Sequence, residues 1–188
     1  YDDLALIRSY LIDQPAYLKL LADAIHAVTR NPGSDRQTLT ESSYDAWIKY
    51  YRQDENAPNS IASYYVKGGL VALALDLTIR RQSAGRHSLD DVMRLMWQRY
   101  GKHFQRHRQG VAEAEIPELV RQATGFDLTE EIRGWTEDTH ELALATALRH
   151  FGLKLTPKEA SEKVSTGLRT AQRGSDLVVT NVINGSAG

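Results

Sequence analysis

The longest apolar run of the sequence lies between residues 63 and 81, and from residue 70 to residue 77 its only polar member is Asp76. The run is too short and too interrupted for a membrane span, which needs about 20 apolar residues. Its length favours a helix over a strand. A helix that is apolar on all sides has to be surrounded by other elements. We therefore predict a central buried helix over residues 63–79, which Arg80 and Arg81 end.

Shorter segments with helical spacing of apolar residues lie on both sides of this run, and several carry helix-start signals. Proline stands in the first turn of two of them, and Ser88 with Asp91 and Asp127 with Glu130 resemble N-terminal capping pairs. The aromatic stretch 42–52 predicts either a short helix or an ordered loop. The stretches 53–60 and 102–110 are polar and are expected to be exposed. The predicted helices are 2–12, 15–28, 88–100, 117–123, one around Ile132 and Trp135, and 141–151.

The pattern changes near the C-terminal end, where β-rich residues 177–183 follow residues 167–171 across a glycine-containing spacer. This arrangement predicts a β-hairpin. A lone two-stranded hairpin is only marginally stable, so we expect its open edge to pair with another chain, as in a homodimer, or to be poorly ordered. The predicted fold class is mainly α with this short β segment.

The composition is that of a soluble globular protein, with 41 % hydrophobic and 25 % charged residues. The 23 basic and 24 acidic residues give no net field that would attract nucleic acid or an anionic membrane. The absence of cysteine excludes disulfides, thiolate metal sites and thiol nucleophiles. The chain starts without methionine and shows no signal peptide, and we expect a piece of a longer protein cut at both ends.

Three short patterns resemble reactive sites and are better explained by structure. His103 and His107 have the i,i+4 spacing of a zinc-binding helix, but the sequence between them lacks the glutamate base of H-E-x-x-H. Ser42-Ser43 has no nucleophile elbow around it, which favours capping or turn serines. Gly68-Gly69 lacks the rest of a phosphate loop and is expected to allow close approach of another helix.

Several segments together closely resemble the glycyl aminopeptidase family of zinc metallopeptidases. Residues 1–4 are similar to the text that follows the family's zinc-binding glutamate, and residues 167–188 are similar to the start of its PDZ domain, with 179–182 as an early strand. The other matching segments are 41–52, 63–68, 70–80 and 88–93, and the likeness continues to Leu153.

The resemblance implies a thermolysin-like fold in which residues 1–155 supply the helical C-terminal part of the catalytic domain. Residues 164–188 would then begin the PDZ-like domain. The resemblance also implies that the zinc ligands, including the H-E-x-x-H helix, lie upstream of Tyr1. This chain alone is accordingly expected to be inactive.

Residues 65–68 match the Tyr-x-Lys-Gly text of the wider zinc aminopeptidase clan. The resemblance implies that the Tyr65 hydroxyl faces the zinc and donates to the oxyanion of the tetrahedral intermediate. The alternative is a packing tyrosine whose hydroxyl binds a backbone carbonyl. Tyr64 is one residue out of register, and a helix would turn it about 100° away. Trp47, Tyr50 and Tyr51 could line a substrate cleft or simply pack, and they are left out of the predicted site.

The sequence therefore predicts part of a zinc aminopeptidase that hydrolyses N-terminal peptide bonds. Its partners would be a peptide substrate and the upstream remainder of the catalytic domain, without nucleic acid or a membrane span. The cytoplasm is the expected location, with the periplasm as the alternative. The competing prediction is a non-catalytic helical scaffold that carries a PDZ-like peptide-binding module.

Overall fold

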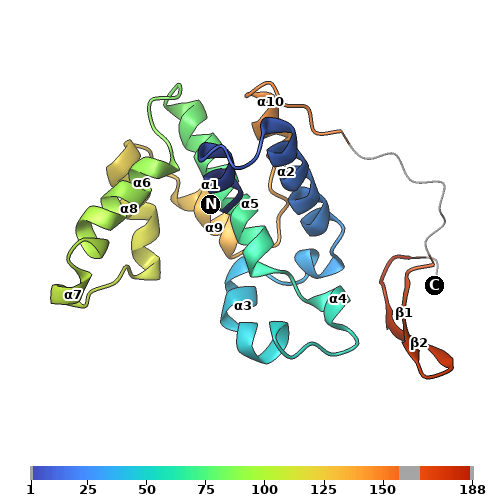
Figure 1. Ribbon diagram of the computed structural model, residues 1–188. Coiled ribbons are helices and arrows are strands. Elements are labelled where there is room, and N and C mark those ends of the chain that lie inside the picture. The colour runs from blue at the N-terminus through green and yellow to red at the C-terminus, as the bar shows by residue number, and fades with distance from the viewer. Residues whose placement is uncertain (1, 157–165, 187–188) are drawn as a thin grey trace. The chain divides into compact units, whose positions relative to one another are not determined.

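The computed structural model describes residues 2–156 and 166–186 and is mainly helical, with one two-stranded antiparallel sheet near the C-terminal end (Figure 1). The predicted fold class is therefore confirmed. The chain divides into two compact units. The first contains residues 1–70, 137–140 and 155–188, and the second contains residues 71–136 and 141–154. Every helix within the described residues is too short or too polar to span a bilayer.

Two helices of the first unit, those that begin at Gln14 and Leu39, are capped at their starts by side chains. The Asp13 carboxylate accepts from the Ala16 amide at 2.9 Å, and Thr38 and Glu41 form a reciprocal capping box. The expected helix 2–12 ends earlier, and Tyr10 adopts a φ of 60° just after it. The helices are α1 (Asp2–Arg8), α2 (Gln14–Thr29), a 3₁₀ turn (Pro32–Asp35), α3 (Leu39–Tyr44), a π-helical turn (Ala46–Tyr50), α4 (Ala57–Ser60) and the start of α5 (Tyr64–Gln82).

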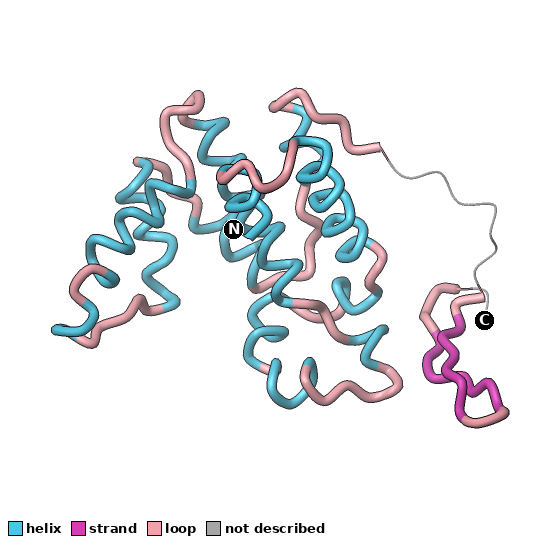
Figure 2. The backbone as a smooth tube through the Cα atoms, in the orientation of Figure 1, coloured by secondary structure: helices cyan, strands magenta, loops and turns pink. Residues whose placement is uncertain are grey.

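The second unit packs the rest of α5 with the later helices, drawn in cyan in Figure 2. The predicted helix 88–100 is split, because a π-helical turn (Trp97–Gly101) follows α6. The other helices are α6 (Leu89–Met96), α7 (Phe104–His107), a 3₁₀ turn (Glu113–Glu115), α8 (Ile116–Thr124), α9 (Thr129–Thr136) and α10 (Leu144–Arg149). The buried core consists of Leu75, Ile79, Val92, Tyr100, Leu119, Val120, Leu128 and Ile132.

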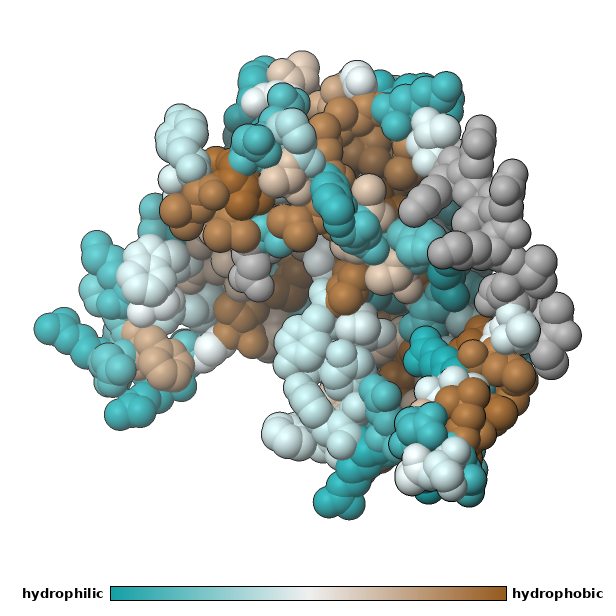
Figure 3. All heavy atoms as spheres, turned by 45° about the vertical axis from the view of Figure 1, so that its right-hand side comes forward, coloured by the Kyte–Doolittle hydropathy of each residue, from teal (hydrophilic) through white to brown (hydrophobic). Residues whose placement is uncertain are grey.

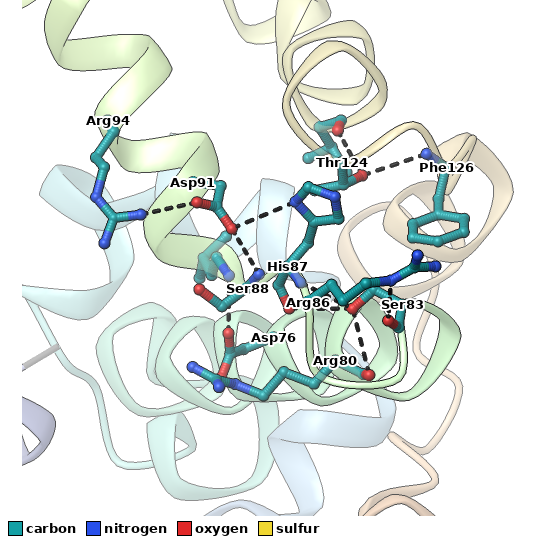
Figure 4. A network of polar contacts seen from close by, with 12 residues as sticks. Asp76, Arg80, Ser83, Arg86, His87, Ser88, Asp91, Arg94, Thr124 and Phe126 are labelled. Atoms are coloured by element: carbon teal, nitrogen blue, oxygen red, sulfur yellow. Dashed lines mark hydrogen bonds and ion pairs between the residues drawn. The ribbon is translucent and has the colours of Figure 1, made fainter.

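Helix α5 confirms the predicted central helix, since it spans Tyr64–Gln82 against an expected range of 63–79. Most apolar side chains from Leu70 to Ile79 are buried. Its one acidic residue, Asp76, accepts hydrogen bonds from the Leu89 amide at 2.8 Å and from Arg80 Nε at 2.7 Å (Figure 4). Because Leu89 is the first residue of α6, the carboxylate caps that helix and ties it to α5.

The paired glycines of α5 do not serve a close helix contact, so that expectation is wrong. A Cβ at Gly68 would make an ordinary contact with Leu39 at 3.8 Å, and one at Gly69 would meet no described atom within 4 Å. The tight approach is at Gly33, where a Cβ would overlap the backbone of Ile61. Glycine is therefore required in the 3₁₀ turn, where the chain passes the segment that leads into α5.

The predicted hairpin is confirmed as β1 (Leu168–Arg173) and β2 (Asp176–Val182), with Gly174 in the turn at a φ of 62°. Its outer edge contacts the loop around α4 in the same unit. The Asn59 amide donates to Val182 O at 2.7 Å and accepts from the Asn184 amide at 2.8 Å. One side chain thus pairs with a carbonyl and an amide two residues apart, as a neighbouring strand would.

The predicted boundary between the two domains, at residues 155–164, falls largely on residues 157–165, which lie outside the described part of the chain. The two stretches expected to be polar and exposed contain a helix each. Helix α4 lies within 53–60, and α7 lies within 102–110. Both are four residues long, and one helical turn is too short to show the periodicity that sequence analysis relies on.

Candidate functional site

The candidate site is built on the first turn of α5, which carries Tyr65 with 59 % of its surface exposed. Ser63 caps this turn, because its hydroxyl lies 3.4 Å from the Val66 amide and its carbonyl accepts from the Lys67 amide at 2.9 Å. The cap fixes the direction in which α5 starts. Tyr65 therefore projects from a defined helix end.

The two residues before this cap are hydrogen-bonded to three earlier segments of the chain. Asn31 Nδ2 donates to Ile61 O at 2.9 Å, and the Ala62 amide donates to Gln37 Oε1 at 3.0 Å. The buried Ser42 hydroxyl donates to Ala62 O. These bonds satisfy the polar groups of an extended segment that has no strand neighbour, and they hold the entry to α5 in place. Ser42 is thus a tertiary contact within α3 and not the capping or turn serine expected from the sequence.

Lys67 follows Tyr65 by two residues in α5, and its side chain is buried, with only 3 % of the residue exposed. Its Nζ donates to Ser34 O at 3.2 Å and to Gln37 O at 3.4 Å. Burial lowers the pKa of this ammonium, and the charges of Asp35 and Asp138 act in the opposite direction. Lys67 thus links α5 to the segment that carries Gln37.

The tyrosine hydroxyls form a cluster centred on Tyr51. Tyr51 Oη lies 2.8 Å from Tyr65 Oη and 3.1 Å from Tyr64 Oη. Tyr51 packs on Trp47 with a centroid distance of 5.1 Å, and the Tyr64 and Tyr65 rings are 4.2 Å apart. Tyr50 makes edge contacts with the other three tyrosines. The end of the π-helical turn therefore faces the first turn of α5 through aromatic rings.

The hydrogen bonds within the cluster separate the acidities of its two α5 tyrosines. Hydrogen bonding with Tyr51 lowers the pKa of Tyr65 from its ordinary value, and the nearby Tyr64 hydroxyl acts in the same direction. Hydrogen bonding with Tyr51 raises the pKa of Tyr64, and the nearby Tyr65 hydroxyl acts in the same direction. The group whose oxygen accepts is stabilised as the phenolate, and the group that donates is stabilised as the phenol.

The packing alternative does not describe Tyr65, because its ring is largely exposed and its hydroxyl contacts another side chain. The expectation that Tyr64 points elsewhere is wrong, since both hydroxyls converge on Tyr51. Tyr51, which the predicted site omitted, belongs to the cluster. The aromatic stretch around Trp47 was the available signal, but its spacing does not show which ring reaches α5.

Two other groups have the residue types of a reactive site but different contacts. Ser83, His87 and Asp91 lie together in the second unit (Figure 4), yet the buried Ser83 hydroxyl contacts the backbone of His87 and not its imidazole. This arrangement closes the turn before α6 and provides no activated nucleophile. His103 precedes the exposed α7 and His107 is its last residue, with ring centroids 6.3 Å apart.

Within residues 2–156 and 166–186, no group of three or more His, Cys, Asp or Glu side chains is placed to hold a metal ion. The zinc that the resemblance implies therefore does not fit the described residues. What the site offers is a cluster of phenols on a rigid helix start, which can donate hydrogen bonds to an oxygen that gains negative charge.

Known proteins resemble this chain in sequence and in fold. The sequence profile of the M61 glycyl aminopeptidase matches residues 1–71. The crystal structure of an aminopeptidase N family protein from Idiomarina loihiensis superposes over 98 % of this chain with a TM-score of 0.84 and 36 % sequence identity. This chain is related to the M61 glycyl aminopeptidases. It spans 33 % of the length of the Idiomarina protein. None of the proteins with curated descriptions matches it.

Proposed function

We propose that this chain is part of a longer zinc-dependent aminopeptidase that hydrolyses N-terminal peptide bonds, with Tyr65 as its oxyanion-stabilising residue. The observation that carries the proposal is the exposed Tyr65 hydroxyl on a helix start tied to Asn31, Gln37 and Ser42. The relation to the M61 glycyl aminopeptidases supports the reaction class.

In the proposed reaction, the scissile carbonyl oxygen gains negative charge as the peptide carbon becomes tetrahedral. A phenol held beside this oxygen donates a hydrogen bond that is stronger in the transition state than in the substrate. Such a donor contributes about 3–4 kcal/mol to lowering the barrier when it needs no rearrangement. The capped first turn of α5 supplies this rigidity for Tyr65.

The zinc belongs to the proposal for the longer protein and not to the described residues of this chain. We propose that its ligands and the general base come from the rest of the catalytic domain, and that this chain is inactive alone. Residues 2–156 would contribute the helical side of the cleft. The cytoplasmic location stays a prediction.

The proposal is tested with a longer protein that includes the upstream sequence. We expect it to hydrolyse glycyl and alanyl p-nitroanilides and to lose this activity when a chelator is added. The 188-residue chain alone should hydrolyse neither substrate. A longer protein that binds no metal and hydrolyses no amino-terminal substrate would contradict the proposal.

The second candidate is a non-catalytic scaffold with a PDZ-like peptide-binding module, and the exposed hairpin is the observation that favours it. Leu177 is 68 % exposed, and Val179 and Val182 are exposed as well; apolar surface is visible on the hairpin in Figure 3. Such a strand can bind a peptide or a second copy of the chain by strand addition. A longer protein that binds peptides without cleaving them would favour this function.

A further inference from the structure

The hydroxyl cluster contains more hydrogens than contacts. Tyr51, Tyr64 and Tyr65 carry one hydroxyl hydrogen each, and the cluster has two oxygen–oxygen contacts, at 3.1 and 2.8 Å. A phenol donates one hydrogen bond and can accept others. When each contact uses one hydrogen, one of the three hydrogens is left to point out of the cluster.

Three arrangements satisfy both contacts. The remaining hydrogen can belong to Tyr65, if Tyr64 donates to Tyr51 and Tyr51 donates to Tyr65. It belongs to Tyr64 if both directions are reversed, and to Tyr51 if both α5 tyrosines donate inward. Only the first arrangement leaves a free donor on the phenol that is 59 % exposed and in register with the Tyr-x-Lys-Gly text.

We propose that Tyr51 is a positioning residue. It accepts a hydrogen bond from Tyr64 and donates one to Tyr65, so that the Tyr65 hydroxyl hydrogen stays available for a hydrogen bond to the substrate oxygen. This inference rests on the proposed function for the identity of that oxygen. The order of the hydrogen bonds is a property of the chain itself and is tested without substrate.

The packing around Tyr51 suits this role. Its ring contacts Trp47 at 5.1 Å and Tyr50 at 5.4 Å, and its hydroxyl contacts both tyrosines of α5. An exposed phenol such as Tyr65 would otherwise be free to change rotamer. The contact with Tyr51 fixes it and also polarises it, because hydrogen bonds in a chain strengthen one another.

The acidities within the cluster agree with this direction. The pKa of Tyr65 is lowered mainly by the hydrogen bond from Tyr51, and the pKa of Tyr64 is raised mainly by its hydrogen bond to Tyr51. The titratable groups that face Tyr65 are Tyr51 and Tyr50 from the π-helical turn and its end, and Tyr64 from α5. The reverse direction would exchange the two shifts.

The test is a pH titration of the 188-residue chain labelled with ¹³C at the tyrosine ζ carbon and followed by NMR. The Tyr65 signal is assigned from its loss in Tyr65→Phe. Tyr51→Phe removes the hydroxyl and keeps the ring on Trp47. Tyr64→Phe removes the first donor, and Tyr50→Phe is the matched control, because its hydroxyl contacts only Ser63 at 3.5 Å among the described residues.

We expect the Tyr65 titration midpoint to rise most in Tyr51→Phe, less in Tyr64→Phe, and to stay unchanged in Tyr50→Phe. An unchanged midpoint in Tyr51→Phe, or an equal rise in Tyr50→Phe, overturns the inference. If Tyr51→Phe does not fold, Tyr64→Phe against Tyr50→Phe decides by the same criterion. A longer protein without peptidase activity would remove the proposed function and leave this titration result standing.

In an active longer protein, Tyr51→Phe should lower kcat by about 2- to 10-fold, the value of one hydrogen bond, with KM unchanged. Tyr50→Phe should change neither. A rise in KM at constant kcat would instead make Tyr51 a substrate-binding residue and contradict its positioning role.

Discussion

The carboxylate of Asp76 accepts a hydrogen bond of 2.8 Å from the backbone amide of Leu89, thirteen positions further along the chain. It also binds Arg80 Nε at 2.7 Å. These two contacts explain why an acidic residue interrupts the apolar run of α5. The buried surface of α5 and the start of α6 meet at this side chain.

Replacing Asp76 with alanine should lower the free energy of unfolding by about 1–2 kcal/mol, since the start of α6 loses its acceptor. Urea unfolding measures the change. Glu130→Gln is the control, because Glu130 is highly exposed and lies 3.8 Å from Arg133, and its effect should stay within about 0.5 kcal/mol. Equal effects of the two variants would contradict the capping role of Asp76.

Gly33 and Gly69 provide a matched pair for backbone packing. Gly33→Ala should destabilise the protein by about 1–3 kcal/mol, because its methyl group would overlap the backbone of Ile61. Gly69→Ala should stabilise it by about 0.5–1 kcal/mol, since the site lies inside α5 with no described atom within 4 Å. Thermal unfolding midpoints that move in the same direction for both variants would refute this account.

Lys67 should make stability depend on pH in the alkaline range. Burial lowers its pKa in the folded protein below 10.5, so the unfolded chain binds more protons between the folded pKa and 10.5. The free energy of unfolding should therefore rise with pH through that window. Charges on Asp35 and Asp138 oppose part of the shift.

The control for Lys67 is Lys67→Met, which keeps the length of the side chain without its charge. The difference in unfolding free energy between wild type and variant should grow in favour of wild type as the pH approaches 10.5. Urea unfolding from pH 8 to pH 10.5 measures it. A difference that does not change with pH would show that Lys67 titrates alike in both states.

Asn59 should hold the edge of the hairpin. In Asn59→Ala, amide exchange of Asn184 should accelerate by about 10-fold, because the acceptor of its hydrogen bond is removed. Hydrogen exchange followed by NMR measures this rate. Ser60→Ala is the control, since that hydroxyl bonds only to the carbonyl of Asn56 among the described residues. Equal protection of Asn184 in both variants would mean that the contact does not order the hairpin.

Sequence patterns predicted the elements that have a long apolar run or a local turn signal. Helix α5 and the hairpin were placed within three residues of their observed bounds, because a long apolar run and a glycine turn between β-rich segments carry their own signal. The one-turn helices α4 and α7 and the two π-helical turns carry no such signal. Their form depends on neighbouring segments.

The candidate site was predicted in part. The Tyr-x-Lys-Gly motif singled out Tyr65. Its hydroxyl partner Tyr51 lies fourteen positions earlier, outside α5. Asn59 and Gly33 show the same limit, because the contact that explains each residue lies with a distant backbone. A single sequence does not encode such pairings in its spacing, and only the folded chain brings them together.

The proposed role of Tyr65 is decided by measuring kcat of the longer aminopeptidase that carries Tyr65→Phe. We predict a fall in kcat of about 10²- to 10³-fold, the usual effect of removing one oxyanion donor, with folding and zinc content unchanged. Tyr44→Phe, which alters a tyrosine that is 89 % exposed, should leave kcat unchanged. A Tyr65→Phe enzyme with the wild-type kcat would contradict the account.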